Sequence, residues 1–310
     1  MKKAAASWIP QSSRGRMEIL VIKLSALGDF VLAFPAMAAI RATHAQARIT
    51  LLTTPPFVPL ALASGWFDHV EIDRRPKIWN VPGLLRLRQQ LRGFDLVYDL
   101  QTSGRSSRYF TLAGRPAWSG IAEGCSLPHA DPNRVFQHSR ERLEGQLHDA
   151  GILALPAPDL SWAKADIAKF NLPERYAVLV PGAAPHRPEK RWPVQNFAAL
   201  AQMLDMPVAV VGGSAEERKM AAEIGGIDLT GRTSLLELAA VMAHGELAIG
   251  NDTGPMHLAA ALGTKSVVLF SGASDPKLTA PRYPDGGWPV ILRESHLANL
   301  PVAQVRAALP

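Results

Sequence analysis

A turn that combines a carboxylate, a hydroxyl and a glycine is the strongest candidate for chemistry in this chain. The segment Asn251-Asp-Thr-Gly-Pro-Met-His257 follows an apolar run ending at Ile249, and Pro255 suits the first position of a helix. Exposed amides and a hydroxyl at such a helix N-terminus would stabilise an anion such as a pyrophosphate. The same residues are also typical of a plain N-cap by Asp252 or Thr253, so both interpretations stand.

A second carboxylate follows the first apolar run. Residues 18–24 are almost continuously apolar, and Ser25-Ala-Leu-Gly-Asp29 connects them to a helical stretch over residues 30–41. A carboxylate at this position acts as a general base when a hydroxyl comes within hydrogen-bond reach. Alternatively, Asp29 caps the helix that follows it.

Basic residues gather in a third turn, between Pro181 and Pro193. Arg187, Lys190 and Arg191 lie there, directly after a buried strand. A fixed cation beside a leaving phosphate stabilises the negative charge that develops on it, without a metal. A solvated loop is the alternative interpretation.

Two further turns carry weaker signals. The segment from Leu229 to Glu237 ends one strand and opens a helix at Thr233 or Ser234, and a routine capped helix explains this pattern equally well. The turn at residues 212–214 has two glycines but lacks the G-x-G-x-x-G spacing of a dinucleotide site.

Short apolar runs alternate with helical stretches along both halves of the chain. This alternation predicts parallel, doubly wound sheets, in which ligands bind beyond the carboxyl ends of the strands. The pattern restarts after the proline-rich residues 155–159, so we expect an α/β protein of two Rossmann-like domains facing a central cleft. The expected strands are 18–24, 48–53, 69–72, 95–100, 176–180, 208–211, 246–249 and 266–270, and the expected helices are 30–41, 83–91, 193–204, 214–224, 234–243, 256–262 and 302–309.

The length of 310 residues suits two domains of about 150 residues each. We expect the first domain over residues 17–160 and the second over residues 161–310. Residues 1–16 are expected to form a disordered extension, with Met17 as an alternative start. The last helix is expected to pack on the body of the protein, with the N-terminal domain as one candidate, rather than to anchor it in a membrane.

Composition restricts the class of partner. The net charge of +6 and the isoelectric point near 9.6 favour anionic partners, but the arginines are scattered as on a solvated surface, and no motif indicates nucleic acid. Cys125 is the single cysteine, and no Cys/His cluster has the spacing of a zinc site. A single cysteine cannot form an intramolecular disulfide, so we expect a protein of the reducing cytoplasm. No apolar stretch approaches the roughly 20 residues that span a bilayer.

Four of these segments together resemble glycosyltransferase family 9, the ADP-heptose:lipopolysaccharide heptosyltransferases. The resemblance implies a GT-B fold and an inverting transfer, without metal or cofactor, from an ADP-linked or other nucleotide sugar to a lipid-linked or phosphorylated saccharide such as the lipopolysaccharide core. It also implies work at the inner face of the inner membrane, where positive charge favours peripheral association with anionic lipid. The segments are Lys23 to Asp29, Lys190 to Pro193, Asp228 to Leu235 and residues 251–257.

The resemblance also implies roles for individual residues. Asp29 matches the proposed base, which removes the proton of an acceptor hydroxyl as it attacks the anomeric carbon, and Lys190 matches the lysine that binds the diphosphate. Family members often carry hydroxyl residues where this chain has Ala183 and Ala184, so those phosphate contacts are not expected here. The implied donor-binding residues are Pro181, Gly182, Lys190, Thr233, Ser234, Leu235, Asp252, Thr253, Gly254 and His257, and the implied acceptor-binding residues are Lys23, Ser25, Asp99 and Gln101.

Two other functions are compatible with two Rossmann-like halves. A nicotinamide-dependent oxidoreductase would need a glycine fingerprint after the first strand, and residues 24–29 do not supply one. A non-catalytic or degenerate nucleotide-sugar-binding protein is the other alternative. Retention of Asp29, Lys190 and Asp252 argues for an active enzyme.

Overall fold

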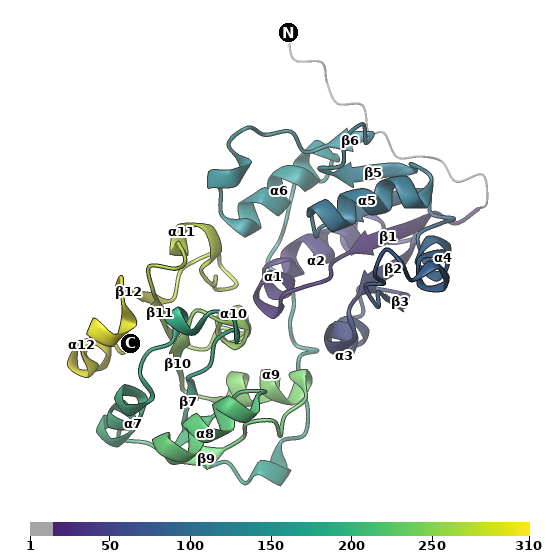
Figure 1. Ribbon diagram of the computed structural model, residues 1–310. Helices are drawn as coiled ribbons and strands as arrows, with labels where there is room; N and C mark the ends of the chain where they lie inside the picture. Colours follow the sequence, from purple (N-terminus) through teal and green to yellow (C-terminus); the bar gives the residue numbers. More distant parts are fainter. Residues whose placement is uncertain (1–14) are drawn as a thin grey trace. The chain divides into compact units, whose positions relative to one another are not determined.

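The computed structural model of this chain describes residues 15–310, so the extension predicted at residues 1–16 lies almost entirely outside the described residues. The described part is an α/β protein with two six-stranded sheets (Figure 1). Every strand pair in both sheets is parallel. The predicted α/β class with two doubly wound halves is confirmed.

The first sheet has the strand order β3-β2-β1-β4-β5-β6. Its central strand, β1, is buried on both faces, which explains why its sequence is a continuous apolar run rather than an alternating one. Its strands are β1 (Glu18–Ile22), β2 (Arg48–Thr53), β3 (His69–Ile72), β4 (Leu96–Asp99), β5 (Ala117–Gly120) and β6 (Leu127–Pro128). The helices between them are α1 (Leu27–Leu32), α2 (Phe34–Thr43), α3 (Val58–Ala63), α4 (Val81–Gln90) and α5 (Gly104–Ala113), and α6 (Ser139–Asp149) follows β6.

The second sheet has the order β12-β11-β10-β7-β8-β9, which is the same topology read from the other edge. Its strands are β7 (Ala177–Val180), β8 (Val208–Val210), β9 (Ile227–Asp228), β10 (Leu247–Asn251), β11 (Ser266–Phe270) and β12 (Val290–Arg293). Its helices are α7 (Val194–Met203), α8 (Ala215–Ile224), α9 (Leu235–His244), α10 (Gly254–Ala261), α11 (Pro276–Thr279) and α12 (Val302–Ala307).

Each sheet has one point where the strand order reverses, between β1 and β4 in the first and between β7 and β10 in the second. Ligands of doubly wound sheets bind beyond the carboxyl ends of the strands at such a point. The predicted acceptor residues lie at or directly after the ends of β1 and β4, and Lys190 and Asp252 follow β7 and β10. The topology therefore selects the turns that the sequence had singled out.

The helical stretch predicted over residues 30–41 is in fact two helices, α1 and α2. Pro35 stands in the first turn of α2. The N–H groups of a first helical turn have no acceptor within the helix, so proline, which lacks an N–H, favours a helix start at this position. Asp29 lies inside α1, in its first turn. The alternative in which Asp29 caps a helix that begins after it is therefore wrong.

The described chain forms two compact units, and α1 belongs to the second although its neighbours in sequence belong to the first. The first unit runs up to Ala26 and continues over Ala33–Pro158, and the second comprises Leu27–Leu32 and Asp159–Pro310. In the second unit α1 packs against α10 (Figure 1). The predicted division of the chain after residue 160 does not include this assignment of α1 to the second unit.

The last helix, α12, packs on α7 of its own unit. Val305 of α12 is fully buried in the core that Trp192 and Phe197 share, and Trp192 Nε1 donates to Leu300 O at 2.9 Å just before the helix. This core belongs to the second unit, so the last helix packs on the body of its own unit. Among residues 15–310, no helix has the length and apolar character that crossing a membrane requires.

Candidate functional site

Helices α1 and α10 approach closely because each places a glycine against the other. A Cβ added to Gly28 of α1 would lie 2.7 Å from Cδ2 of the His257 ring, and one added to Gly254 of α10 would lie 2.6 Å from Cβ of Leu27. Carbon atoms do not pack at these distances, so glycine is needed on both helices. Asp29 follows Gly28 and is exposed on α1. The contact therefore places the predicted base on the second unit, on a helix packed against α10.

Asp252 follows β10 directly and receives two donors on one carboxylate oxygen. Lys190 Nζ lies 2.5 Å from Asp252 Oδ2, and Ser274 Oγ donates to the same oxygen at 2.8 Å. His257 Nε2 lies 3.9 Å from the other oxygen, Oδ1. Burial opposes ionisation of Asp252, but the interactions with His257 and Lys190 outweigh it and hold the pKa of this carboxyl below its ordinary value. Asp252 is therefore an ionised group that fixes the ammonium of Lys190.

Asn251, the last residue of β10, holds the segment that carries Lys190. Its Nδ2 donates to Pro181 O at 2.7 Å, and its Oδ1 accepts from Trp192 N at 3.0 Å. The carboxamide thus joins both ends of the turn after β7, and Lys190 lies between them in the short helix η4 (Pro188–Lys190). Asn251 is fully buried and was not among the predicted site residues. A polar residue at the end of an apolar strand was the signal that could have revealed it.

Thr253 is the N-cap of α10, yet its hydroxyl makes no capping hydrogen bond. The carboxylate of Asp252 is engaged by Lys190 and Ser274 instead. A plain N-cap therefore does not describe this turn. The half-buried Thr253 and Gly254 stand at the start of an eight-residue helix, the arrangement from which an anion site was predicted.

The turn at Thr233, Ser234 and Leu235 is a capped helix start. Ser234 Oγ accepts from Glu237 N, and the Glu237 carboxylate accepts from Ser234 N at 2.8 Å, which forms a capping box at the start of α9. The box accounts for the Ser234 side chain. Thr233 and Leu235 are half-buried beside it, so donor binding here stays a prediction about backbone groups.

Glu217 of α8 occupies the glycine-rich turn after β8. Its carboxylate accepts from Gly213 N at 2.8 Å and from Ser214 N at 2.7 Å. Gly182 lies against the same carboxylate, because a Cβ added to Gly182 would collide with it. These amides already bind a negative group, which disfavours a phosphate at this turn. Gly182 has a packing role here, beside its predicted place in donor binding.

Lys23, Asp99 and Gln101 form a network that joins the ends of β1 and β4. Lys23 Nζ donates to Leu100 O at 3.0 Å, and Gln101 Oε1 accepts from Ser25 N at 3.2 Å. Asp99 is fully buried, and its Oδ1 accepts from Gln101 N at 3.1 Å. Burial raises the pKa of Asp99 to about 6. The structure brings the four predicted acceptor residues together. Asp99, however, is buried beneath the loop that follows β4 and accepts hydrogen bonds from its backbone.

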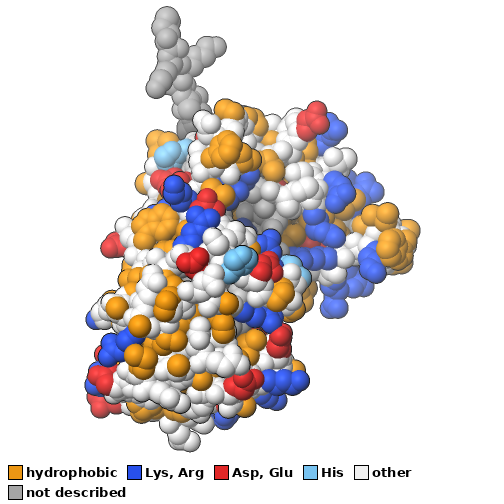
Figure 2. All heavy atoms as spheres, turned by 60° about the vertical axis from the view of Figure 1, so that its left-hand side comes forward, with side chains coloured by type: hydrophobic (Ala, Val, Ile, Leu, Met, Phe, Trp, Pro, Cys, Tyr) orange, Lys and Arg blue, Asp and Glu red, His pale blue; other side chains and the backbone are white. Residues whose placement is uncertain are grey.

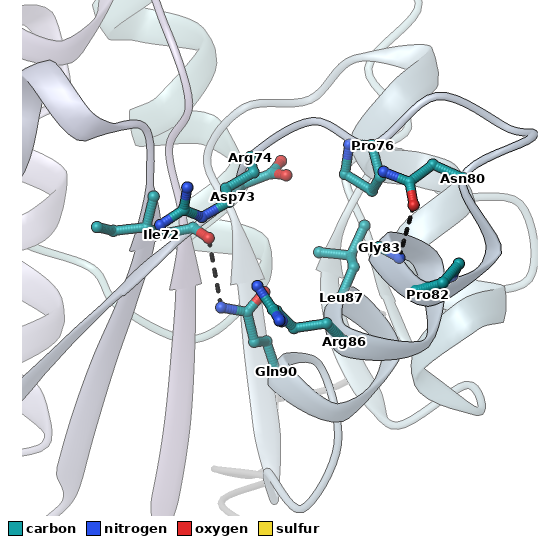
Figure 3. Close-up of a pocket in the computed structure, with 10 residues that line it drawn as sticks. All are labelled: Ile72, Asp73, Arg74, Pro76, Asn80, Pro82, Gly83, Arg86, Leu87 and Gln90. Carbon is teal, nitrogen blue, oxygen red and sulfur yellow. Dashed lines mark hydrogen bonds between the residues drawn. The ribbon is translucent and has the colours of Figure 1, made fainter.

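A cavity of about 230 Å³ lies in the first unit, at the start of α4 (Figure 3). Arg74 and Asn80 of the preceding loop line it, together with Arg86 and Gln90 of the helix. None of the predicted site residues is among its lining residues. The cavity is therefore separate from the turns described above.

Known proteins match this chain in sequence and in fold. Residues 84–288 match glycosyltransferase family 9 (heptosyltransferase). Lipopolysaccharide heptosyltransferase 2 of Escherichia coli K12 is 29% identical over 310 residues, which cover 86% of this chain and 85% of that protein. The similarity therefore extends through both sheets.

Solved structures share the fold. A glycosyltransferase family 9 protein from Veillonella parvula DSM 2008 aligns with a TM-score of 0.78 at 20% identity, over 94% of this chain and 95% of that chain. E. coli heptosyltransferase WaaC with ADP-2-deoxy-2-fluoro heptose aligns with a TM-score of 0.73 at 22% identity, over 94% and 98%. The more distant TibC, an iron-containing dodecameric glycosyltransferase of enterotoxigenic E. coli, gives 0.55 at 14% identity, over 91% and 63%. Within the described part of this chain, no group of three or more His, Cys, Asp or Glu side chains is arranged to hold a metal ion.

Proposed function

This chain belongs to glycosyltransferase family 9, and on that premise we propose that it is an inverting, metal-independent transferase of heptose or a related sugar. The donor is an ADP-linked or other nucleotide sugar, and the acceptor is the lipopolysaccharide core or a related glycan. Two relatives support this choice. One is named lipopolysaccharide heptosyltransferase 2, and the other, WaaC, was solved with an ADP-linked fluoro-heptose.

The observation that carries the proposal is the geometry around Asp252. An ionised, buried carboxylate holds the ammonium of Lys190 at 2.5 Å, at the start of a helix whose N-cap hydroxyl is not used for capping. The α1 helix packs on that same α10 helix and exposes Asp29. A cation for a diphosphate and a carboxylate for a hydroxyl proton thus belong to one compact unit.

The chemistry assigns one task to each group. The acceptor oxygen attacks the anomeric carbon from the side opposite the diphosphate, and Asp29 takes the hydroxyl proton as the new C–O bond forms. The bond between the anomeric carbon and the phosphate oxygen breaks, and its electron pair leaves with the nucleoside diphosphate. Lys190 stabilises the charge on that leaving group, so no bound metal is part of the proposal.

The acceptor side of the proposal rests on the first unit. Ser25 is half-buried, and its amide is held by Gln101, which is itself held by Asp99. We assign acceptor contacts to Ser25, Gln101 and Lys23, and a positioning role to Asp99, because its carboxylate is fully buried. A lipid-linked acceptor implies a cytoplasmic enzyme that associates peripherally with the inner membrane.

The glycine-rich turn after β8 is not suited to bind a nicotinamide cofactor. Gly213 N and Ser214 N already bind the Glu217 carboxylate, so they are not free for a pyrophosphate. The turn after β1 has no glycine fingerprint either. A nucleotide is therefore expected at the turn after β10, beside Lys190.

A thermal-shift series with ADP, ADP-heptose, UDP and NAD tests the donor class. A ligand that binds only the native state raises the free energy of unfolding by about 2.7 kcal/mol at a hundredfold excess over its Kd. ADP and ADP-heptose should raise Tm, and the Lys190→Ala variant should lose this shift. Stabilisation by NAD with no response to ADP would overturn the assignment.

A further inference from the structure

Four large apolar side chains stand exposed within eight residues of the first unit. Ile78 is 82% exposed, Trp79 72%, Val81 57% and Leu85 54%. They lie in the loop before α4 and on its first turns. Single exposed apolar residues are ordinary on protein surfaces, but a contiguous group indicates a place of contact.

The same segment is strongly basic. Residues 74–94 contain six basic residues and no acidic residue, so their formal charge equals the net charge of the whole chain, +6. In the view of Figure 2, by contrast, acidic side chains stand beside many of the Lys and Arg side chains. The expectation that basic residues are evenly scattered is therefore wrong for this segment. Its basic residues, all exposed, are Arg74, Arg75, Lys77, Arg86, Arg88 and Arg92.

The basic and the apolar side chains lie in the same loop and helix start. Lys77 Nζ lies 5.1 Å from the centre of the Trp79 ring, a cation–π contact. Arg74 and Arg86 line the cavity at the start of α4, one from the loop and one from the helix (Figure 3). Positive charge thus lies on both sides of the apolar side chains along the chain.

Hydrogen bonds hold the loop in shape. Asn80 Oδ1 accepts from Gly83 N at 3.0 Å and caps α4, and the Arg75 guanidinium donates to Leu24 O at 3.0 Å. Leu87 anchors the helix in the core of the first unit. The apolar side chains are therefore presented by a fixed loop and helix start.

We propose that residues 74–88 dock this protein on the surface of an anionic phospholipid membrane. Trp79 and Ile78 enter the headgroup region, where tryptophan is favoured, and the surrounding Arg and Lys side chains bind headgroup phosphates. Charge complementarity selects this occupant, because the apolar side chains belong to a stretch, residues 74–94, with six basic residues and no acidic one. Such a stretch matches a membrane, whose interior is apolar and whose surface is negative. The inference rests on the proposed function in one respect, that the acceptor is held in the same membrane.

Sedimentation of the full chain with vesicles tests this surface. Wild-type protein should bind vesicles that contain phosphatidylglycerol and not vesicles of phosphatidylcholine alone, and the binding should weaken as salt is raised. The double variant Ile78→Ser/Trp79→Ser should lower the partition coefficient about tenfold or more, because the apolar insertion is lost. The charge variant Arg86→Glu/Arg88→Glu should lower it by a similar factor.

Matched controls come from the same chain. Phe136→Ser removes an aromatic side chain that is 78% exposed in η2 (Arg134–Phe136) of the same unit. Lys219→Glu/Lys277→Glu makes an equal charge change at exposed positions of the second unit. Both controls should bind vesicles as the wild type does. All variants should keep the wild-type Tm, because the substituted side chains are exposed.

Two results would overturn the proposal: wild-type protein that does not bind phosphatidylglycerol vesicles, or both segment variants binding as the controls do. Sugar transfer to a water-soluble, delipidated acceptor is measured in parallel. Transfer without vesicle binding contradicts the docking surface alone. Vesicle binding without transfer of a sugar from any nucleotide sugar contradicts the proposed function alone.

Discussion

Gly28 lies against the imidazole of His257, so close that a Cβ at residue 28 would stand 2.7 Å from Cδ2 of the ring. His257 in turn lies 3.9 Å from Asp252, the residue that holds Lys190. The helix that carries Asp29 therefore contacts the histidine that lies beside the carboxylate positioning the cation. This relationship explains why a glycine directly precedes the predicted base.

The Gly28→Ala substitution should destabilise the protein. The added methyl group must displace the His257 ring or separate α1 from α10, and overpacking of this kind costs about 1–3 kcal/mol. Urea denaturation gives the change in the free energy of unfolding. Gly104→Ala is the matched control, because a Cβ at residue 104 meets nothing within 4 Å. Equal effects of the two substitutions would contradict the tight α1–α10 contact.

Replacing Asp29 with Asn should abolish most of the sugar transfer while nucleotide binding persists. The amide keeps the size of the side chain but cannot take the acceptor proton, and loss of a general base typically lowers kcat about 10²–10⁴-fold. Steady-state kinetics and an ADP thermal shift measure the two properties. Asp205→Asn, at an exposed position of the second unit, serves as the control. A kcat near the wild-type value would remove Asp29 from the mechanism.

Loss of the Lys190 ammonium should slow departure of the nucleoside diphosphate. Lys190→Ala removes the charge that Asp252 fixes, and we expect kcat to fall about 10²–10³-fold, the size of effect seen when a group that stabilises transition-state charge is removed. Lys219→Ala in the same unit is the control and should keep full activity. Full activity of Lys190→Ala at saturating donor would show that another group or a metal carries the charge.

Asp99 should make stability depend on pH between about 4 and 6. Its pKa is raised from 3.8 to about 6 by burial, so in this window the folded protein binds a proton that the unfolded chain releases. The contribution of Asp99 to the free energy of unfolding should therefore fall as pH rises through the window, by about 3 kcal/mol in total, and this contribution should change no further above it. The slope should be absent in Asp99→Asn and present in Asp205→Asn. A slope that persists in Asp99→Asn would assign the titration to another group.

Much of the fold could be predicted from the sequence because its signals are local. A strand buried on both faces is a continuous apolar run, as at residues 18–22 and 266–270, and these runs alternate with helices in both halves. The resemblance to glycosyltransferase family 9 depends on short motifs in a fixed order, and it identified the family. The turns after β1, β4, β7 and β10 were also visible, since each follows an apolar run with charged, hydroxyl or glycine residues.

What each of those residues does was decided by contacts between segments far apart in the chain. α1 belongs to the second unit because Gly28 meets His257, and no composition or periodicity near residue 28 reports that contact. Asp99 is fully buried and therefore supports the loop instead of facing a ligand. Asn251 is also fully buried, and its side chain makes the hydrogen bonds that join both ends of the segment carrying Lys190. The sequence by itself predicted the central strands of both sheets, the turns that follow them and the family, but β5, β6 and β12 were not among the expected strands. Tertiary packing alone decided which side chains meet, because that depends on the distances between helices and strands that the chain brings together only when it folds.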